Sequence, residues 1–260
     1  FTRYMNELVT TDPDGRTATA QPGVYLGTLN EAIEPHGLKF APDPAWGDKS
    51  ALGGAIGNNS TGAHSLRYGK TDAYVEEVEA VLADGTVTTF GEVAIEELAA
   101  LAAGDDLEAA IYAELARIIE EEADLIEERY PDLKRNVSGY NLDWLIEDAR
   151  GAVRGVGEPD AEGGTINVAK LRCGGEGPLA IVTEATGSLG PIPETKGMVR
   201  LAYESVGDAM ADVAPIVEHE PAATEAMDDV LLDLARETAE FKPVTKMLPD
   251  GTGAVLIVEF

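Results

Sequence analysis

Residues 50–69 read Ser-Ala-Leu-Gly-Gly-Ala-Ile-Gly-Asn-Asn-Ser-Thr-Gly-Ala-His-Ser-Leu-Arg-Tyr-Gly, with five glycines and two adjacent asparagines. Glycine tolerates positive φ and lets a ligand come close to backbone N–H groups. Successive N–H groups in such a segment form a concave anion site, and Asn, Ser and Thr add short hydrogen-bonding side chains. We therefore expect a loop that holds a ligand with a pyrophosphate and a polar ring edge, although ordinary surface loops share this composition.

Other short motifs surround this stretch in a defined order. In chain order they are Pro22-Gly23-Val24, Pro35-His36-Gly37, Pro42-Asp43-Pro44, then Tyr68-Gly69 and a strand-like run that ends at Asp84-Gly85. A second block lies more than 100 residues further on. It reads Cys173-Gly174-Gly175-Glu176-Gly177-Pro178-Leu179-Ala180-Ile181-Val182-Thr183-Glu184-Ala185 and is followed by Pro191-Ile192-Pro193-Glu194.

Together these blocks resemble the flavin-binding domain of the FAD-linked oxidase family, which includes vanillyl-alcohol oxidase, glycolate oxidase and D-lactate dehydrogenase. The segment Arg135-Asn136-Val137-Ser138-Gly139-Tyr140-Asn141-Leu142 resembles the large branch similar to D-lactate dehydrogenase. Members of that branch often carry a C-terminal iron–sulfur region, and no iron–sulfur motif occurs in these residues.

The resemblance implies an α+β fold. Residues 1–194 would form the second subdomain of a PCMH-type FAD-binding domain, and residues 195–260 would begin a ferredoxin-like α+β cap domain. The N-terminal half of the flavin domain, the rest of the cap and the family's catalytic and metal-binding histidines are expected outside this chain. On this reading the chain is partial, its catalytic residues are unknown, and it holds no metal site.

Hydrophobic periodicity predicts the individual elements. In the first domain it indicates strands at 17–24 (running into a turn), 166–171 and 179–189, a hairpin at 74–90, helices at 25–35 and 94–130, and an exposed loop at 151–164. In the second domain it indicates strands at 198–203, 222–227 and 254–260 and helices at 206–217 and 229–240. Pro215 is expected to cut the first of these two helices short.

The resemblance also implies which residues contact FAD. In the first block they are Pro42, Asp43, Gly53, Gly54, Asn58, Asn59, Ser60, Gly62 and Tyr68, and in the second block Gly174, Glu176, Gly177, Ile181 and Val182. Glycines would admit the flat ring and the pyrophosphate, and Asn and Ser side chains would bond ribityl and phosphate oxygens. Two residues depart from the family pattern: Gly175 and Pro178 stand where the family commonly has Ser and Thr, and proline has no N–H to donate.

The remaining chemically notable residues carry weaker signals. His64 is a candidate general base, although it could equally bond phosphate or face solvent, and His36 and His219 are not spaced like metal ligands. Tyr25, Trp46 and Trp144 are expected as core or edge residues rather than as ring-stacking ones. The single cysteine, Cys173, excludes an internal disulfide, and its apolar, glycine-rich setting favours packing over catalysis.

The chain is strongly acidic, with a formal net charge of −29 and a pI near 4.2. Disorder does not explain this charge, because 44% of the residues are hydrophobic. At molar salt the Debye length falls to about 3 Å and self-repulsion is screened, so we expect a halophile's protein that expands at low salt. The charge argues against nucleic acid and anionic membranes, and no apolar run approaches a membrane span. A cytoplasmic location follows, with peripheral membrane attachment left open.

These features favour an FAD-dependent oxidoreductase that oxidises a small 2-hydroxy acid, of the D-lactate or glycolate type, by hydride transfer to flavin. The electron acceptor would be an iron–sulfur region or subunit, a quinone or oxygen. The alternative is a non-catalytic fragment or degenerate homologue that binds no flavin. A nicotinamide Rossmann enzyme fits poorly, because residues 53–57 follow no strand and lack the G-x-G-x-x-G spacing. Apolar surface left by the missing half-domain would favour a dimer.

Overall fold

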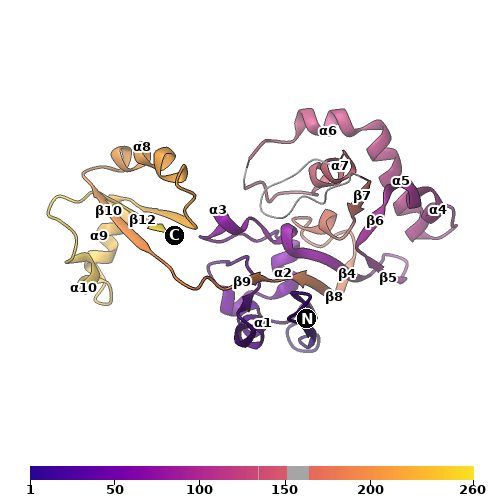
Figure 1. The fold of residues 1–260 in the computed structure, drawn as a ribbon, viewed down its shortest axis with the longest axis horizontal. Coiled ribbons are helices and arrows are strands. Elements are labelled where there is room, and N and C mark those ends of the chain that lie inside the picture. The colour runs from indigo at the N-terminus through magenta and orange to yellow at the C-terminus, as the bar shows by residue number, and fades with distance from the viewer. Residues whose placement is uncertain (134, 151–163) are drawn as a thin grey trace. The chain divides into compact units, whose positions relative to one another are not determined.

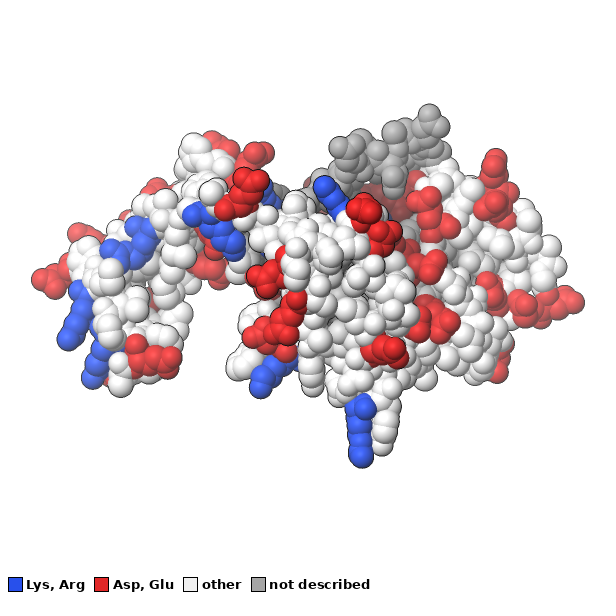
Figure 2. Space-filling view, turned by 60° about the horizontal axis from the view of Figure 1, so that its bottom comes forward, with Lys and Arg blue, Asp and Glu red and all other residues white. Residues whose placement is uncertain are grey.

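The computed structural model describes residues 1–133, 135–150 and 164–260, which form two compact units. The first unit comprises residues 1–62 and 69–192, and the second comprises residues 63–68 and 193–260. Both contain helices and antiparallel sheet, so the α+β class is confirmed. Acidic side chains are scattered over the face shown in Figure 2 rather than gathered in one block.

A five-stranded antiparallel sheet forms the centre of the first unit. Its strand order is β1 (Leu8–Asp12), β2 (Thr17–Ala20), β8 (Ile181–Ser188), β4 (Val75–Val81) and β5 (Val87–Phe90). The predicted hairpin is confirmed as β4 and β5, with Gly85 at φ 90° in the turn. The second glycine block leads into β8, which pairs with β4 (Figure 1). Residues far apart in the sequence therefore meet at the middle of this sheet.

Short helices and two small sheets complete the first unit. On the chain before β4 lie α1 (Leu26–Ile33), η1 (Glu34–His36), η2 (Gly47–Lys49), α2 (Leu52–Gly57) and η3 (Thr71–Tyr74). After β5 come η4 (Ile95–Glu97), α4 (Leu98–Leu101), α5 (Leu107–Glu121), α6 (Ala123–Arg129), α7 (Leu142–Arg150) and η5 (Lys170–Arg172). The small sheets pair β3 (Leu38–Lys39) with β9 (Gly190–Pro191) and β6 (Glu92–Ala94) with β7 (Thr165–Asn167). The core is apolar and includes Leu26, Ile33, Phe40, Ile56, Val75, Val78 and Ile166.

The second unit has the predicted β-α-β-α-β order. Its elements along the chain are β10 (Met198–Tyr203), α8 (Val206–Val217), β11 (Ala223–Met227), α9 (Asp229–Glu237), α10 (Lys242–Thr245) and β12 (Ala254–Glu259). The short helix α3 (Ser65–Tyr68), from earlier in the chain, also belongs to this unit. β12 lies between β10 and β11 and is antiparallel to both. Buried residues of β12, with Leu256 at their centre, pack against Ala209 of α8.

Several sequence predictions about individual elements were wrong. Residues 52–57 form a helix rather than a loop, because the amides of Leu52 and Gly53 donate to the carbonyls of Val24 and Pro22 at 2.8 Å each. That tertiary contact satisfies the first N–H groups of the helix and outweighs the low helix propensity of glycine.

Other corrections concern where elements end. The strand predicted at 166–171 stops at Asn167, whose side-chain Oδ1 accepts from the Ala169 amide at 2.9 Å and turns the chain. Pro215 lies inside α8 without ending it, since the helix runs to Val217. The strands β1, β3, β6 and β9 were not predicted. Most of the loop predicted at 151–164 lies outside the described residues.

Candidate flavin-binding site

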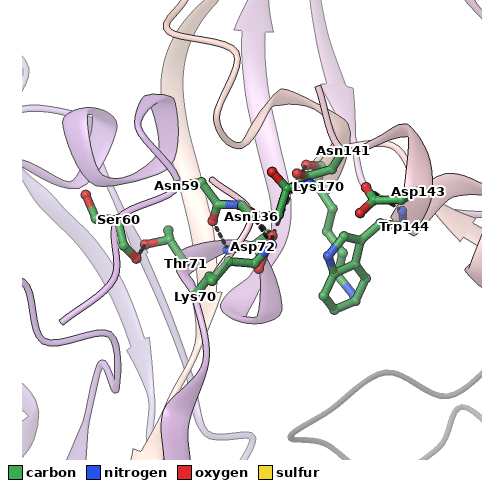
Figure 3. Close-up of polar contacts among 10 residues, drawn as sticks. All are labelled: Asn59, Ser60, Lys70, Thr71, Asp72, Asn136, Asn141, Asp143, Trp144 and Lys170. Carbon is green, nitrogen blue, oxygen red and sulfur yellow. Dashed lines mark hydrogen bonds and ion pairs between the residues drawn. The ribbon is translucent and has the colours of Figure 1, made fainter. Parts of the chain in front are cut away.

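In the segment that follows α2, the side chain of one asparagine points into the protein interior. Asn59 has a positive φ of 46° and is completely buried. Its Nδ2 donates to Asp72 Oδ2 at 2.6 Å, and its Oδ1 accepts from the Asp72 amide at 3.0 Å (Figure 3). Both the nitrogen and the oxygen of the Asn59 side-chain amide are therefore bound to Asp72 inside the protein.

Asp72 is the centre of a buried polar network. Lys70 Nζ lies 2.9 Å from Asp72 Oδ2, and Asn141 Nδ2 donates to the same oxygen at 3.0 Å. Lys70 also donates to the Asn136 carbonyl at 2.8 Å (Figure 3). Lys70 and Asn141 are only 7% and 6% exposed, so the lysine supplies the charge that a buried carboxylate requires. This network joins the glycine segment, Lys70–Asp72 and residues 136–141 in one place.

The second glycine block joins the same assembly through its backbone. The amides of Gly174 and Glu176 donate to the carbonyls of Ile56 and Gly57, at 3.1 and 2.9 Å, at the end of α2. Gly174 has φ 84°, and a Cβ there would lie 2.8 Å from the carbonyl oxygens of both Val137 and Gly139. Only glycine fits this position. The two blocks that carry the family resemblance are thus in direct contact.

Cys173, between these groups, is completely buried and belongs to the apolar core. Burial raises the pKa of its thiol, and the nearby Asp72 carboxylate raises it further. The thiol therefore stays protonated and is a poor nucleophile. The expectation that this cysteine packs rather than reacts is supported by its position.

A pocket of about 280 Å³ lies beside the buried network, within the first unit. It is lined by Pro44, Ala45, Trp46, Ser50, Asn58, Asn59, Ser60, Thr61 and Val137. Its two walls, the turn at 44–50 and the segment at 58–61, are held together at Gly62, where a Cβ would overlap the backbone carbonyl of Asp43. The fold therefore fixes the width of the pocket.

Only some of the backbone amides of residues 58–62 donate hydrogen bonds within the protein. The amides of Asn58, Asn59 and Ser60 donate to carbonyls of α2, those of Gly54, Ile56 and Ala55 respectively. Within the described parts of the chain, the amides of Thr61 and Gly62 make no hydrogen bond. The predicted anion site is thus reduced to these two N–H groups together with the side chains of Asn58, Ser60 and Thr61. That donor set fits the polar edge or phosphate of a nucleotide cofactor.

The structure distributes the predicted contact residues in different ways. Asn58, Asn59 and Ser60 line the pocket, whereas Gly53 and Gly62 approach other backbone, since a Cβ at Gly53 would lie 3.1 Å from the Pro22 carbonyl oxygen. The remaining predicted residues do not line this pocket. They are Pro42, which is buried; Asp43, Gly54 and Gly177, which are exposed; Gly174 and Glu176 at the end of α2; Ile181 and Val182 at the start of β8; and Tyr68, which belongs to the second unit.

Of the aromatic residues expected in the core or at an edge, Trp46 lies outside the core, because it is 75% exposed and lines the pocket. Trp144 is partly buried, with Lys170 Nζ 4.7 Å from the ring centroid. Trp46 is more exposed than Trp144 because it lies on a turn between Pro44 and Ser50 whose residues are mostly exposed.

His64 belongs to the second unit. Its Nε2 lies 3.2 Å from Glu259 Oε2, and Lys196 Nζ lies 3.0 Å from the other oxygen of that carboxylate. Burial acts to raise the pKa of Glu259, but Lys196 and His64 together lower it below its ordinary value. The histidine is thus held by a carboxylate rather than facing solvent.

Lys70, Asp72 and Asn141 were not predicted as organising residues. Asn141 lies in the 135–142 motif, whereas Lys70 and Asp72 follow the Tyr68-Gly69 motif in a Lys-Thr-Asp turn that has the composition of a solvated turn. Across the described ranges, no group of three or more His, Cys, Asp or Glu is placed to hold a metal. Among those same residues, every helix is too short or too polar to cross a membrane.

Comparison with protein families gives two matches. Residues 1–91 match the FAD binding domain, and residues 192–260 match the C-terminal domain of FAD linked oxidases. The intervening residues contain the second glycine block and the segment at 136–141, which meet the first match in the structure.

Similar curated proteins span nearly the whole chain. D-2-hydroxyglutarate dehydrogenase of Pseudomonas putida is 31% identical over 100% of the chain and 25% of that protein. Glycolate oxidase subunit GlcD of Bacillus subtilis is 29% identical over 99% of the chain, and D-lactate dehydrogenase of Archaeoglobus fulgidus is 26% identical over 99%. The chain covers 40% and 42% of these two proteins, so it spans between a quarter and about two fifths of its relatives' length.

Among solved structures, alkyldihydroxyacetonephosphate synthase matches with a TM-score of 0.59 and 18% identity. The match covers 99% of this chain and 37% of the synthase chain. At this level of identity the match concerns the fold alone.

Proposed function

Because the chain belongs to the FAD-linked oxidase family, we propose that it is the cofactor-holding part of a flavin-dependent enzyme that oxidises a small 2-hydroxy acid. The observation that carries this proposal is the contact between the two glycine blocks beside the pocket, made by Gly174 and Glu176 on the end of α2. This contact brings the second block to the end of α2, directly before the segment whose Thr61 and Gly62 amides make no hydrogen bond among the described residues.

FAD is proposed to lie against both blocks. Asn58, Asn59 and Ser60 line the pocket, while Gly53, Gly62 and Gly174 allow close approaches to other backbone. The remaining contacts are proposed at Pro42, Asp43, Gly54, Tyr68, Glu176, Gly177, Ile181 and Val182. A Cβ at Gly54 would meet no atom within 4 Å, so the space above it is open to a ligand.

In the proposed reaction the protein supplies position and the cofactor supplies the redox chemistry. Bound flavin is a two-electron acceptor, able to take a hydride from a carbon that bears a hydroxyl group. The residues of this chain hold the cofactor: the Thr61 and Gly62 amides offer hydrogen bonds, and the Asp72 network keeps Asn59, and so the segment, in its left-handed turn. No proton-transfer role is assigned to a residue of this chain.

The names of the relatives support a proposal for the substrate class. D-2-hydroxyglutarate, glycolate and D-lactate, the substances in their names, all carry a hydroxyl group beside a carboxylate. We propose a substrate of this class. As the electron acceptor we propose an iron–sulfur region or subunit, with quinone or oxygen as the alternatives, and we propose a cytoplasmic, dimeric protein.

Anaerobic mixing of the full FAD-loaded protein with D-lactate, glycolate or D-2-hydroxyglutarate tests the proposal. At least one of these acids should bleach the visible absorption of the flavin, whereas a 3-hydroxy acid of equal charge should not. If the protein holds FAD and none of the three acids reduces it, the proposed substrate class is wrong. If it holds no FAD, the degenerate-homologue reading replaces the proposal.

A further inference from the structure

The indole of Trp46 is a large aromatic group on the wall of the pocket formed by the turn at 44–50. It is 75% exposed, and the other wall carries the polar residues Asn58, Ser60 and Thr61. A single exposed apolar side chain needs no explanation by itself. A flat aromatic group beside hydrogen-bonding groups is, however, the combination that binds ring systems with polar edges.

The backbone that carries Trp46 is rigidly held. The Trp46 carbonyl accepts from the Ser50 amide at 2.8 Å, from the Ser50 hydroxyl at 3.0 Å and from the Lys49 amide at 2.8 Å. The Gly47 amide donates to the Pro44 carbonyl at 2.8 Å, closing the same turn. With the backbone fixed, a bound ring would restrict only the two side-chain torsions of the indole, which keeps the entropy cost of binding low.

The segment at 58–61, which carries the polar groups, is held in a fixed position relative to this turn. Gly62 packs directly on the Asp43 backbone, just before the turn, and Asn59 is anchored to buried Asp72. The distance between the indole-bearing turn and the segment at 58–61 is therefore set by the fold. A preorganised gap of this kind suits a rigid, flat ligand better than a flexible chain.

The size of the pocket points to one ring system. Its volume of about 280 Å³ lies just below the range for drug-sized small-molecule sites, roughly 300–1,000 Å³. It can hold one end of a dinucleotide and not the whole molecule. Resting on the FAD binding proposed above, we propose that Trp46 stacks on one of the two flat ring systems of FAD, the isoalloxazine or the adenine.

Equilibrium dialysis of FAD against the full protein and four variants tests this role. Removing a stacking ring weakens binding by about 5- to 100-fold, so Trp46→Ala should weaken FAD binding within this range. Trp46→Phe keeps a ring and should stay within about threefold of the wild type, whereas Trp46→Leu keeps only apolar bulk and should resemble Trp46→Ala. Tyr4→Ala is the matched control, because Tyr4 is 78% exposed and does not line the pocket.

The outcomes separate this inference from the proposed function. If the wild type holds no FAD, the proposed function has failed. If the wild type binds FAD and Trp46→Ala binds it equally well, the stacking role is wrong while the function stands, and equal binding by Trp46→Leu and Trp46→Phe would also overturn stacking. Dialysis with FMN and with ADP identifies the ring: a loss in Trp46→Ala for FMN alone assigns the isoalloxazine, and a loss for ADP alone assigns the adenine.

Discussion

The buried network around Asp72 and the pocket beside it share one segment of chain but differ in how their polar groups are used. Asn59 turns inward, where both ends of its amide are bound to Asp72. Asn58, Ser60 and Thr61 line the pocket, and the Thr61 amide has no partner among the described residues. Two adjacent asparagines thus serve different purposes.

The difference separates residues that build the site from residues that contact a ligand. A buried polar group must be satisfied by the protein, so its loss is felt in stability. A polar group that is open to the pocket contributes little to the stability of the free protein, so its removal lowers ligand affinity instead. Substitutions on the two sides should therefore give opposite patterns of effect.

The largest expected effect is at Gly54, an exposed residue of α2 four positions before the pocket-lining Asn58. Gly54→Val should abolish FAD retention, because its side chain would fill the open space above α2, where a Cβ has no neighbour within 4 Å. Stability should change by less than about 1 kcal/mol, since valine is no worse a helix former than glycine. Flavin absorption after desalting and urea unfolding measure the two effects.

Gly207→Val serves as the control, because Gly207 is also a helical glycine with ordinary space for a Cβ and lies in α8. It should retain FAD. Full retention of FAD by Gly54→Val would remove that glycine from the cofactor site.

Asp72→Asn should give the opposite pattern on the network side. It leaves the Lys70 ammonium buried without a counter-charge, and breaking a buried ion pair costs about 3–5 kcal/mol. Urea unfolding should show this loss, with FAD affinity falling as a consequence. The exposed turn residue Asp84, changed to Asn, should unfold like the wild type.

A double variant, Asp72→Leu with Lys70→Met, checks the cause, because replacing both charges by apolar groups of similar size is often tolerated. It should recover part of the stability that Asp72→Asn loses. A loss below about 1 kcal/mol in Asp72→Asn itself would mean that the network does not support the segment.

A smaller effect is expected where the second block meets the 136–141 segment. A Cβ at Gly175 would lie 2.8 Å from Cε1 of Tyr140, so Gly175→Ala should cost about 1 kcal/mol by crowding the ring. Adding Tyr140→Ala should relieve the crowding. If the single substitution is neutral in urea unfolding, the tyrosine ring moves freely and does not constrain the block.

The smallest effect belongs to the second unit, at the more exposed pair of Glu259 with Lys196. The folded-state pKa of Glu259 is lowered, so the pair stabilises the protein above the carboxyl's unfolded pKa and loses that stabilisation as the pH falls through the folded value. Glu259→Gln should cost less than about 1 kcal/mol at neutral pH, and the difference from the wild type should vanish in acid. A difference that grows in acid would have the wrong sign.

Local sequence patterns predicted the elements whose determinants are local. The β4–β5 hairpin follows from the Asp84-Gly85 turn, and α8 and α9 begin at Ser205 and Asp228, whose side chains cap the first amides. The helix α2 was missed because carbonyls of Pro22 and Val24 satisfy its amides. Helix propensity alone contains no such information.

The site shows the same division. The family resemblance implied Asn58 and Ser60, which line the pocket, and the glycine-rich polar composition of their segment indicated a loop that could hold a ligand. Asp72 was not, because its partners Asn59 and Asn141 lie 13 and 69 residues away in the chain. Trp46 was assigned to the core or an edge because its exposure depends on a turn held by hydrogen bonds rather than on apolar periodicity.

We propose above all that the pocket beside the Asp72 network holds part of FAD. The most direct test is the absorption spectrum of the full protein in molar potassium chloride, before and after addition of FAD and removal of the unbound cofactor. Flavin bands should persist in the wild type and be lost in Gly54→Val while both proteins remain folded. A folded wild-type protein that emerges colourless after FAD addition would contradict the proposal.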